Sequence, residues 1–224
     1  MTKEEKILNK QQEEAVKHKA GPLLIVAGAG TGKTKVVTER IKWLIGENLA
    51  KPEEILALTF TEKAAREMEE RVDQALPYGT FGLWISTFHS FCDRILRSEA
   101  LHIGLNPHYK LLTEAETYLL VKNNFWKFNL TYFRPTGNPY KFIEGMIQHF
   151  SRLKDEDIDP KDYKNEEYSE LVDAYKAYEE LKTAEQVMDF SDLISNTLKL
   201  FRTRKAILAR YQKQFKYILV DEFQ

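Results

Sequence analysis

Cysteine, glycine and proline are scarce in this chain. Only one of its 224 residues is cysteine, and it has ten glycines and seven prolines. A single cysteine excludes an intramolecular disulfide, and a zinc site would need ligands almost wholly from five scattered histidines. The low glycine and proline content argues against collagen-like and disordered chains. We therefore expect a folded protein from a reducing, intracellular compartment.

Long hydrophobic runs and an excess of one charge are also lacking. The longest apolar runs, such as those at residues 23–27 and 217–220, are far too short to cross a bilayer of about 30 Å. The N-terminal residues lack the apolar stretch of a secretion signal. The 33 basic and 34 acidic side chains nearly cancel, which argues against a strongly basic nucleic-acid arm. These absences predict a cytoplasmic protein with no membrane contact. They do not indicate a binding partner.

Short apolar runs alternate with helix-like stretches at both ends of the chain. The runs span residues 22–27, 55–59, 83–86 and 217–220. Continuous apolar runs of this length are typical of strands that are buried on both faces of a sheet. Strands and helices in alternation predict a parallel sheet with right-handed crossovers. The sequence therefore predicts an α/β fold.

The middle of the chain changes character after about residue 100. The helices expected there span residues 113–128, 139–153 and 166–182. The joins between them are rich in proline, glycine, asparagine and acidic residues, and no convincing strand lies among them. We expect an all-helical subdomain at 101–189, inserted into an α/β domain that consists of residues 1–100 and 190–224.

Residues 27–34, AGAGTGKT, match the phosphate-loop pattern except at Ala27, which replaces a glycine. The glycines let successive backbone N–H groups turn toward phosphate oxygens, and the following helix adds the positive end of its dipole. Lys33 would reach the β- and γ-phosphates, and the Thr34 hydroxyl would ligate Mg²⁺. A glycine-rich turn that binds nothing is the alternative, but the position between an apolar run and an amphipathic helix favours a nucleotide site. The predicted cofactor-binding residues of the loop are Ala27, Gly28, Ala29, Gly30, Thr31, Gly32, Lys33 and Thr34.

An acidic pair, Asp221 and Glu222, follows the apolar run at 217–220. Ligands of open parallel sheets bind outside the carboxyl ends of the strands, so both carboxylates are expected beside the phosphate loop. Asp221 would hold Mg²⁺ through its water shell, and Glu222 would orient or deprotonate the attacking water. The pair by itself could be a solvated strand end. Together with the phosphate loop it predicts a site for ATP and Mg²⁺.

Five segments of the chain, taken in order, resemble the motifs of one family. They are LNKQQEEAV at 8–16, AGAGTGKT at 27–34, LTFTEKAA at 58–65, TFHS at 87–90 and DEFQ at 221–224. Together they look like the ordered motifs of the UvrD/Rep-like superfamily 1 DNA helicases. The helical middle matches that family only in position and character, like its insertion called subdomain 1B. The resemblance implies a RecA-like P-loop NTPase sheet, subdomain 1A, that carries this insertion.

The resemblance assigns roles to further residues. Gln12 is similar to the family glutamine that reads the adenine edge, although it could also form a helix-capping box with Asn9. Lys35 stands where many relatives have arginine near the base, and an ammonium group lacks the planar guanidinium that stacks. Gln224 resembles the glutamine that senses the γ-phosphate; the alternative is a mere chain-end amide. The implied catalytic residues are Lys33, Glu222 and Gln224.

Six residues match positions where the family contacts single-stranded DNA. They are Phe60, Thr61, Lys63, Thr87, Phe88 and His89. An aromatic face can stack on any base, and hydroxyl and ammonium groups can hold phosphates without reading the sequence. Phe60 could instead be a core residue at a strand end, and His89 a structural histidine. For the aromatic residues at 125–133, packing in a helical core is favoured over base stacking.

The resemblance implies the N-terminal portion of an ATP-dependent DNA helicase or translocase that moves 3′ to 5′. Its partners would be single-stranded DNA, single/double-strand junctions and a missing C-terminal RecA-like lobe with the arginine fingers. Loss of such a finger slows phosphoryl transfer by about 10³- to 10⁵-fold, so we expect weak nucleotide binding, poor ATP hydrolysis and no unwinding from these residues alone. The alternatives are a P-loop ATPase or kinase with no nucleic-acid role, and an inert or partner-binding module.

Overall fold

The chain folds into two compact units. The computed structural model describes residues 8–76, 81–131, 133, 137–138, 140–159 and 169–223. Unit 1 consists of Met1–Phe91 and Ala206–Gln224, and unit 2 consists of Cys92–Lys205. The boundaries fall inside two helices, α4 (Phe88–Glu99) and α9 (Lys205–Gln214). In the described ranges, no helix has the length and apolar character of a bilayer-crossing segment.

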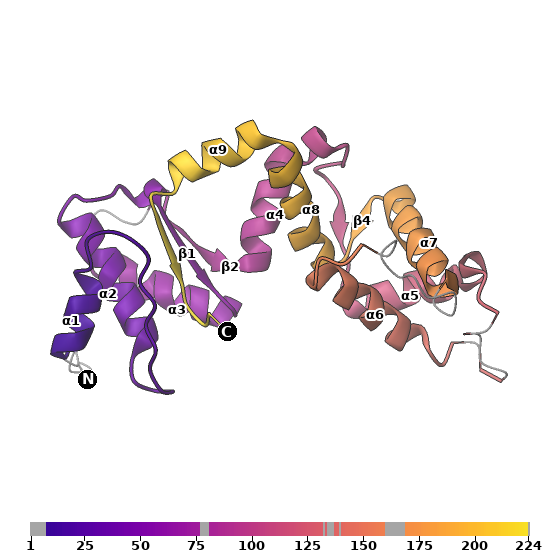
Figure 1. Cartoon of the computed structure of the whole chain (residues 1–224), viewed down its shortest axis with the longest axis horizontal. Coiled ribbons are helices and arrows are strands. Elements are labelled where there is room, and N and C mark those ends of the chain that lie inside the picture. Colours follow the sequence, from indigo (N-terminus) through magenta and orange to yellow (C-terminus); the bar gives the residue numbers. More distant parts are fainter. Residues whose placement is uncertain are drawn as a thin grey trace. The chain divides into compact units, whose positions relative to one another are not determined.

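A three-stranded parallel sheet forms the centre of unit 1 (Figure 1). The strand β1 (Ile55–Thr59) pairs with β2 (Trp84–Thr87) on one side and with β5 (Tyr217–Val220) on the other. The register sets Thr59 beside Thr87 and Leu58 beside Val220, so the carboxyl ends of all three strands lie at one edge. The predicted α/β fold with a parallel sheet is confirmed.

Helices also build the N-terminal part of unit 1. They are α1 (Lys10–Val16), α2 (Lys33–Gly46) and α3 (Glu62–Asp73), with the short 3₁₀ helix η1 (Pro52–Glu54) before β1. Ile41 and Leu44 of α2 pack with Met68 of α3 and with Ile55 and Ala57 of β1 in one buried cluster. Apolar residues three or four positions apart share one face of a helix, which explains how α2 and α3 each bury a stripe against the sheet.

The apolar run before the phosphate loop is not a strand, so the prediction for residues 22–27 is wrong. Residues 22–28 have no regular secondary structure, and Leu24 and Val26 are 71% and 87% exposed. A strand exists only when its N–H and C=O groups pair with a neighbour. The sheet of unit 1 has the order β2-β1-β5 and contains no pairing to this run among the described residues. Apolar composition alone therefore overestimated the sheet.

Unit 2 is mainly helical. Its elements are η2 (Ala100–Ile103), β3 (Lys110–Leu111), α5 (Glu114–Asn123), η3 (Phe125–Phe128), α6 (Ile143–Asp155), α7 (Ser169–Glu185), β4 (Val187–Met188) and α8 (Phe190–Thr203). The strands β3 and β4 form a parallel pair of two residues each. The expectation of an all-helical middle is wrong at this pair. Two residues are too few to produce a recognisable strand pattern.

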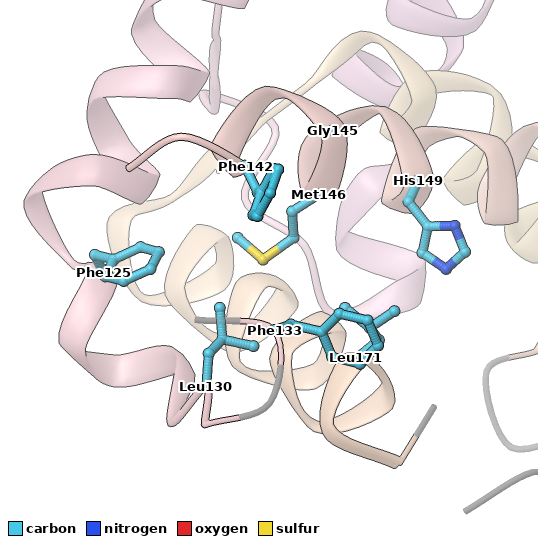
Figure 2. Close-up of a pocket in the computed structure, with 8 residues that line it drawn as sticks. All are labelled: Phe125, Leu130, Phe133, Phe142, Gly145, Met146, His149 and Leu171. Atoms are coloured by element: carbon cyan, nitrogen blue, oxygen red, sulfur yellow. The ribbon is translucent and has the colours of Figure 1, made fainter. Parts of the chain in front are cut away.

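The core of unit 2 is built from α5, η3, α6 and α7. Val121, Phe128, Phe150 and Tyr178 are buried in one cluster. An apolar pocket of about 240 Å³ lies in this unit (Figure 2). Its lining residues are Phe125, Leu130, Phe133, Phe142, Gly145, Met146, His149 and Leu171. Core packing accounts for Phe128, as the sequence indicated, whereas Trp126 is 72% exposed.

Five charged side chains meet between α6, α7 and the start of α8. Lys154 and Lys182 both pair with Asp192, and Lys182 also lies 2.8 Å from Asp189 and 2.9 Å from Glu179. Both lysine side chains are only 3% exposed. Burial by itself would lower the pKa of Lys154, but the charges of Asp192, Glu179 and Asp189 raise it above its ordinary value. The cluster therefore joins three helices through ion pairs that are largely shielded from water.

Replacing Asp192 with alanine should destabilise unit 2 by about 3–5 kcal/mol, because two buried ammonium groups lose the carboxylate that they share. Asp173→Ala removes an exposed ion pair with Lys176 on α7 and should leave the free energy of unfolding nearly unchanged. Urea denaturation of both variants measures the difference. Similar small losses in the two variants would contradict a structural role for the cluster.

Candidate nucleotide and nucleic-acid site

The phosphate loop is shaped by two glycines and one hydroxyl. Gly30 and Gly32 have φ of 73° and 93°, in the left-handed region that favours glycine. Thr31 donates its hydroxyl to the carbonyl oxygen of Gly28 at 2.8 Å and so closes the turn. The helix α2 begins directly after Gly32. Its first N–H groups and the positive end of its dipole are therefore available to an anion held by the loop.

Lys33, the first residue of α2, places its ammonium group on the loop. The Nζ atom donates to the carbonyl oxygens of Ala27 and Gly28, both at 2.9 Å. A phosphate oxygen is a stronger acceptor for an ammonium group than a neutral carbonyl, so a phosphate can draw Lys33 away from these contacts. Lys35 lies on the same first turn of α2 and is half-buried.

Thr34 and Asp221 meet although they are 187 positions apart in the chain. The Thr34 hydroxyl donates to Asp221 Oδ2 at 2.8 Å. Asp221 is 4% exposed, and its N–H donates to the carbonyl oxygen of Leu58 at 2.8 Å, at the end of β1. The contact places a hydroxyl and a carboxylate at the first turn of the helix that the phosphate loop opens.

This pair of oxygen ligands suits Mg²⁺. The ion keeps several waters and is usually bound by one or two protein side chains together with substrate phosphates. Within the described part of the chain, no group of three or more His, Cys, Asp or Glu side chains is arranged to hold a metal ion. Thr34 and Asp221 offer two side-chain oxygen atoms to an ion of this kind.

Glu222 follows Asp221 at the end of β5. It is exposed, and its φ of 61° is uncommon for a residue other than glycine. Such backbone conformations cluster at functional sites, where the surrounding structure maintains them. The position is compatible with the predicted catalytic role, which stays a prediction. Gln224, the third predicted catalytic residue, lies outside the described residues.

Gln12 reaches the phosphate loop from α1. Its Nε2 donates to the carbonyl oxygen of Thr31 at 3.0 Å, and its Oε1 accepts the N–H of Asn9 at 2.9 Å. The reciprocal bond from the Gln12 N–H to Asn9 Oδ1 completes the predicted capping box. One side chain therefore caps α1 and contacts the loop at the same time, so the capping interpretation does not exclude a place at the nucleotide site.

Arg40 fixes α1 against α2, and the sequence patterns did not predict it. Its Nη1 donates to the carbonyl oxygens of Val16 at 2.8 Å and Ala15 at 3.3 Å, near the end of α1. Burial of the guanidinium lowers the pKa of Arg40. The available signal was its position between Val36 and Leu44, four residues from each, on the apolar face of α2. Arg40 thus positions the helix that carries Gln12.

Phe60, Thr61 and Lys63 lie just beyond the carboxyl end of β1. Phe60 is 76% exposed, which excludes the core role that the sequence left open. Thr61 caps α3 by accepting the N–H of Ala64 at 3.1 Å. The Lys63 side chain is 87% exposed. This segment therefore presents an aromatic ring and an ammonium group to solvent.

The second predicted nucleic-acid segment lies at the end of β2. Phe88 is 39% exposed and His89 is half-buried, whereas Thr87 is only 5% exposed. The Thr87 Oγ1 accepts the N–H of Ser90 at 3.1 Å, at the start of α4. The hydroxyls of Thr87 and Ser90 both lie against Glu62, at 2.8 and 2.7 Å. Glu62 and Ser90 were not predicted as site residues, although a carboxylate inside a run that was predicted to contact phosphates was a visible signal.

Comparison with known proteins identifies the family. The family model described as the UvrD/REP helicase N-terminal domain matches residues 8–224. The chain belongs to this helicase family. The predicted resemblance is thereby confirmed.

Curated relatives of this UvrD/REP-family chain carry the name "ATP-dependent DNA helicase PcrA". The protein from Bacillus subtilis (strain 168) is 42% identical over 222 residues, which cover 97% of this chain and 29% of the relative. The protein from Staphylococcus aureus (strain Mu50) is 40% identical over 221 residues, which cover 97% of this chain and 30% of the relative. The chain thus spans 29% to 30% of the length of these two relatives.

In this UvrD/REP-family loop, Gly32→Ala should destabilise the chain by about 1–2 kcal/mol. An L-residue is strained at this φ, and the added Cβ would lie 3.3 Å from Gln12 Nε2. Gly46→Ala, at the end of α2, is the matched control: its Cβ meets nothing within 4 Å, and alanine is the better helix former by up to about 1 kcal/mol. Thermal denaturation compares the two variants. Stabilisation by both would show that the loop does not need glycine at position 32.

Proposed function

We propose that this chain is the N-terminal portion of an ATP-dependent DNA helicase or translocase. In this proposal the full-length protein couples Mg-ATP hydrolysis to movement along single-stranded DNA and to unwinding, 3′ to 5′. The observation that carries the proposal is the contact between Thr34 and Asp221 beside the phosphate loop. The names of the relatives support the activity, and the direction rests on the family resemblance alone.

The nucleotide half of the site would work through side chains with distinct tasks. The backbone of the loop at 27–32 would hold the phosphates, and Lys33 would exchange its two carbonyl contacts for phosphate oxygens. Thr34 and Asp221 would hold Mg²⁺, which supplies charge neutralisation at the phosphates. Glu222 would orient or deprotonate the attacking water. Gln12 and Lys35 would lie toward the base.

The nucleic-acid half would use the same edge of the sheet. Since β1, β2 and β5 are parallel, their carboxyl ends bring Phe60, Thr87 and Asp221 to one side of unit 1. Phe60 and Phe88 would stack on bases, and Thr61, Lys63, Thr87 and His89 would hold the backbone. A change at the nucleotide would then have only a short path to the residues that bind the strand, because both groups of residues lie at the same edge of the sheet.

We also propose a division of the chain into two subdomains. Residues 1–100 and 190–224 would form the RecA-like subdomain 1A, and 101–189 would form the inserted, 1B-like subdomain. The division of the chain supports an insertion, because unit 2 interrupts unit 1 in the sequence. Its bounds, Cys92–Lys205, are wider than those proposed from the sequence.

The isolated chain should turn over ATP poorly and should not unwind DNA. The chain spans 29% to 30% of its relatives' length. We propose that the rest of the full-length protein contains a second RecA-like lobe with arginine fingers. The lack of such a finger costs about 10³- to 10⁵-fold in rate. A coupled ATPase assay with oligo(dT) and a strand-displacement assay on a forked duplex measure both activities. Robust DNA-stimulated turnover by these 224 residues would contradict the proposal.

Phe60→Ala should weaken binding of oligo(dT) by about 1–3 kcal/mol, the usual loss when a stacking aromatic is removed. Phe81→Ala is the matched control, because Phe81 is 97% exposed but precedes β2 instead of following a strand. Fluorescence anisotropy at several salt concentrations measures both, and affinity should fall as salt rises. Binding of Mg-ATP without any binding of oligo(dT) would favour the alternative, an ATPase or kinase with no nucleic-acid role.

A further inference from the structure

Glu62 connects the two segments that we propose to hold a single strand. It is the first residue of α3, between Thr61 and Lys63. Across the sheet edge, its Oε1 accepts the hydroxyl of Thr87 at 2.8 Å and the hydroxyl of Ser90 at 2.7 Å. The chain therefore has a carboxylate at the place where the proposed function needs groups that attract phosphate.

The contact with Glu62 uses the hydroxyl protons of both Thr87 and Ser90. Each hydroxyl has one proton to donate. The contact from Thr87 to Ser90 is longer, at 3.1 Å, than the contacts from either residue to Glu62, and the Ser90 N–H is directed at the Thr87 oxygen. Both hydroxyl protons are therefore committed to Glu62. Neither Thr87 nor Ser90 can donate to a phosphate while that arrangement persists.

The carboxylate is ionised and accessible. The hydrogen bonds from Ser90 and Thr87 lower the pKa of Glu62, and the nearby charge of Arg66 acts in the same direction. Glu62 is also an exposed residue, so its side chain has solvent-facing rotamers to adopt. A negative charge beside these donors repels a nucleic-acid backbone, and the exposed position allows the backbone to displace it.

We propose that Glu62 sets how tightly this surface holds a single strand by competing with the phosphodiester backbone for the hydroxyl protons of Thr87 and Ser90. The proposal rests on the proposed function, since it assumes that a strand binds at these two segments. A strand gains the two donors only when it displaces Glu62. A residue that merely braced α3 against α4 would have the opposite effect, because its loss would disorder the donors and weaken binding.

The test compares oligo(dT) binding by the whole chain in matched variants. Glu62→Gln keeps the shape and removes the charge, and it should tighten binding by about 3- to 10-fold, since a neutral acceptor holds the hydroxyls less strongly. Glu69→Gln, which removes an exposed carboxylate of the same helix, controls for net charge. Glu62→Ala should act in the same direction as Glu62→Gln. Melting temperatures of all variants check that each is folded.

A second background separates competition from simple charge removal. In a chain that carries Thr87→Val and Ser90→Ala, no hydroxyl remains to compete for, so Glu62→Gln should tighten binding no more than Glu69→Gln does. An equal gain in both backgrounds, no gain beyond that of Glu69→Gln, or weaker binding by Glu62→Gln would each overturn the proposal. Failure of the unaltered chain and every variant to bind oligo(dT) at any salt concentration would instead overturn the proposed function, and this proposal with it.

Discussion

The structure of the candidate site depends on one hydrogen bond between distant parts of the chain. Thr34 is the second residue of the helix after the phosphate loop, and Asp221 directly follows β5, the last strand of the sheet in the chain. Their contact at 2.8 Å ties the loop to the sheet edge. It brings together the two kinds of oxygen that Mg²⁺ takes from a protein in phosphoryl-transfer sites. The contact therefore sets a carboxylate beside the helix turn that follows the glycine-rich loop.

Parallel topology is what makes that contact possible. Strands that run in one direction end at one edge, so β1, β2 and β5 deliver Phe60, Thr87 and Asp221 to the same side of unit 1 whatever their separation in the sequence. The same edge therefore carries both groups that would attract phosphate and a carboxylate that repels it. Glu62 lies there with its carboxylate on two hydroxyls, close to the residues that would attract a phosphate backbone.

Local signals predicted local structure well. The capping box of Asn9 and Gln12, and the runs that became β1, β2 and β5, each depend on a few neighbouring residues and are confirmed. The run at 22–27 failed because a strand also needs a partner, which no local pattern contains. The pair of β3 and β4 was missed because a strand of two residues is too short to show an alternating pattern of apolar residues.

The candidate site was predictable in part, for the same reason. The motif from Ala27 to Thr34 identifies the residues of the phosphate loop directly, and the expected parallel topology predicted Asp221 beside the loop. Arg40 and Glu62 act through contacts with segments 24 to 28 positions away, so their partners were not visible in sequence. Side chains that position others are the class that a sequence pattern reveals least.

The measurement that tests the account most directly is the effect of Mg²⁺ on nucleotide affinity. Titration of a fluorescent ATP analogue into the chain, with Mg²⁺ and with EDTA, should show tighter binding with the metal. Asp221→Asn should remove most of that difference while binding in EDTA persists, since the loop itself would be unchanged. A metal effect of the same size in Asp221→Asn would contradict the claim that the loop and this carboxylate form one site.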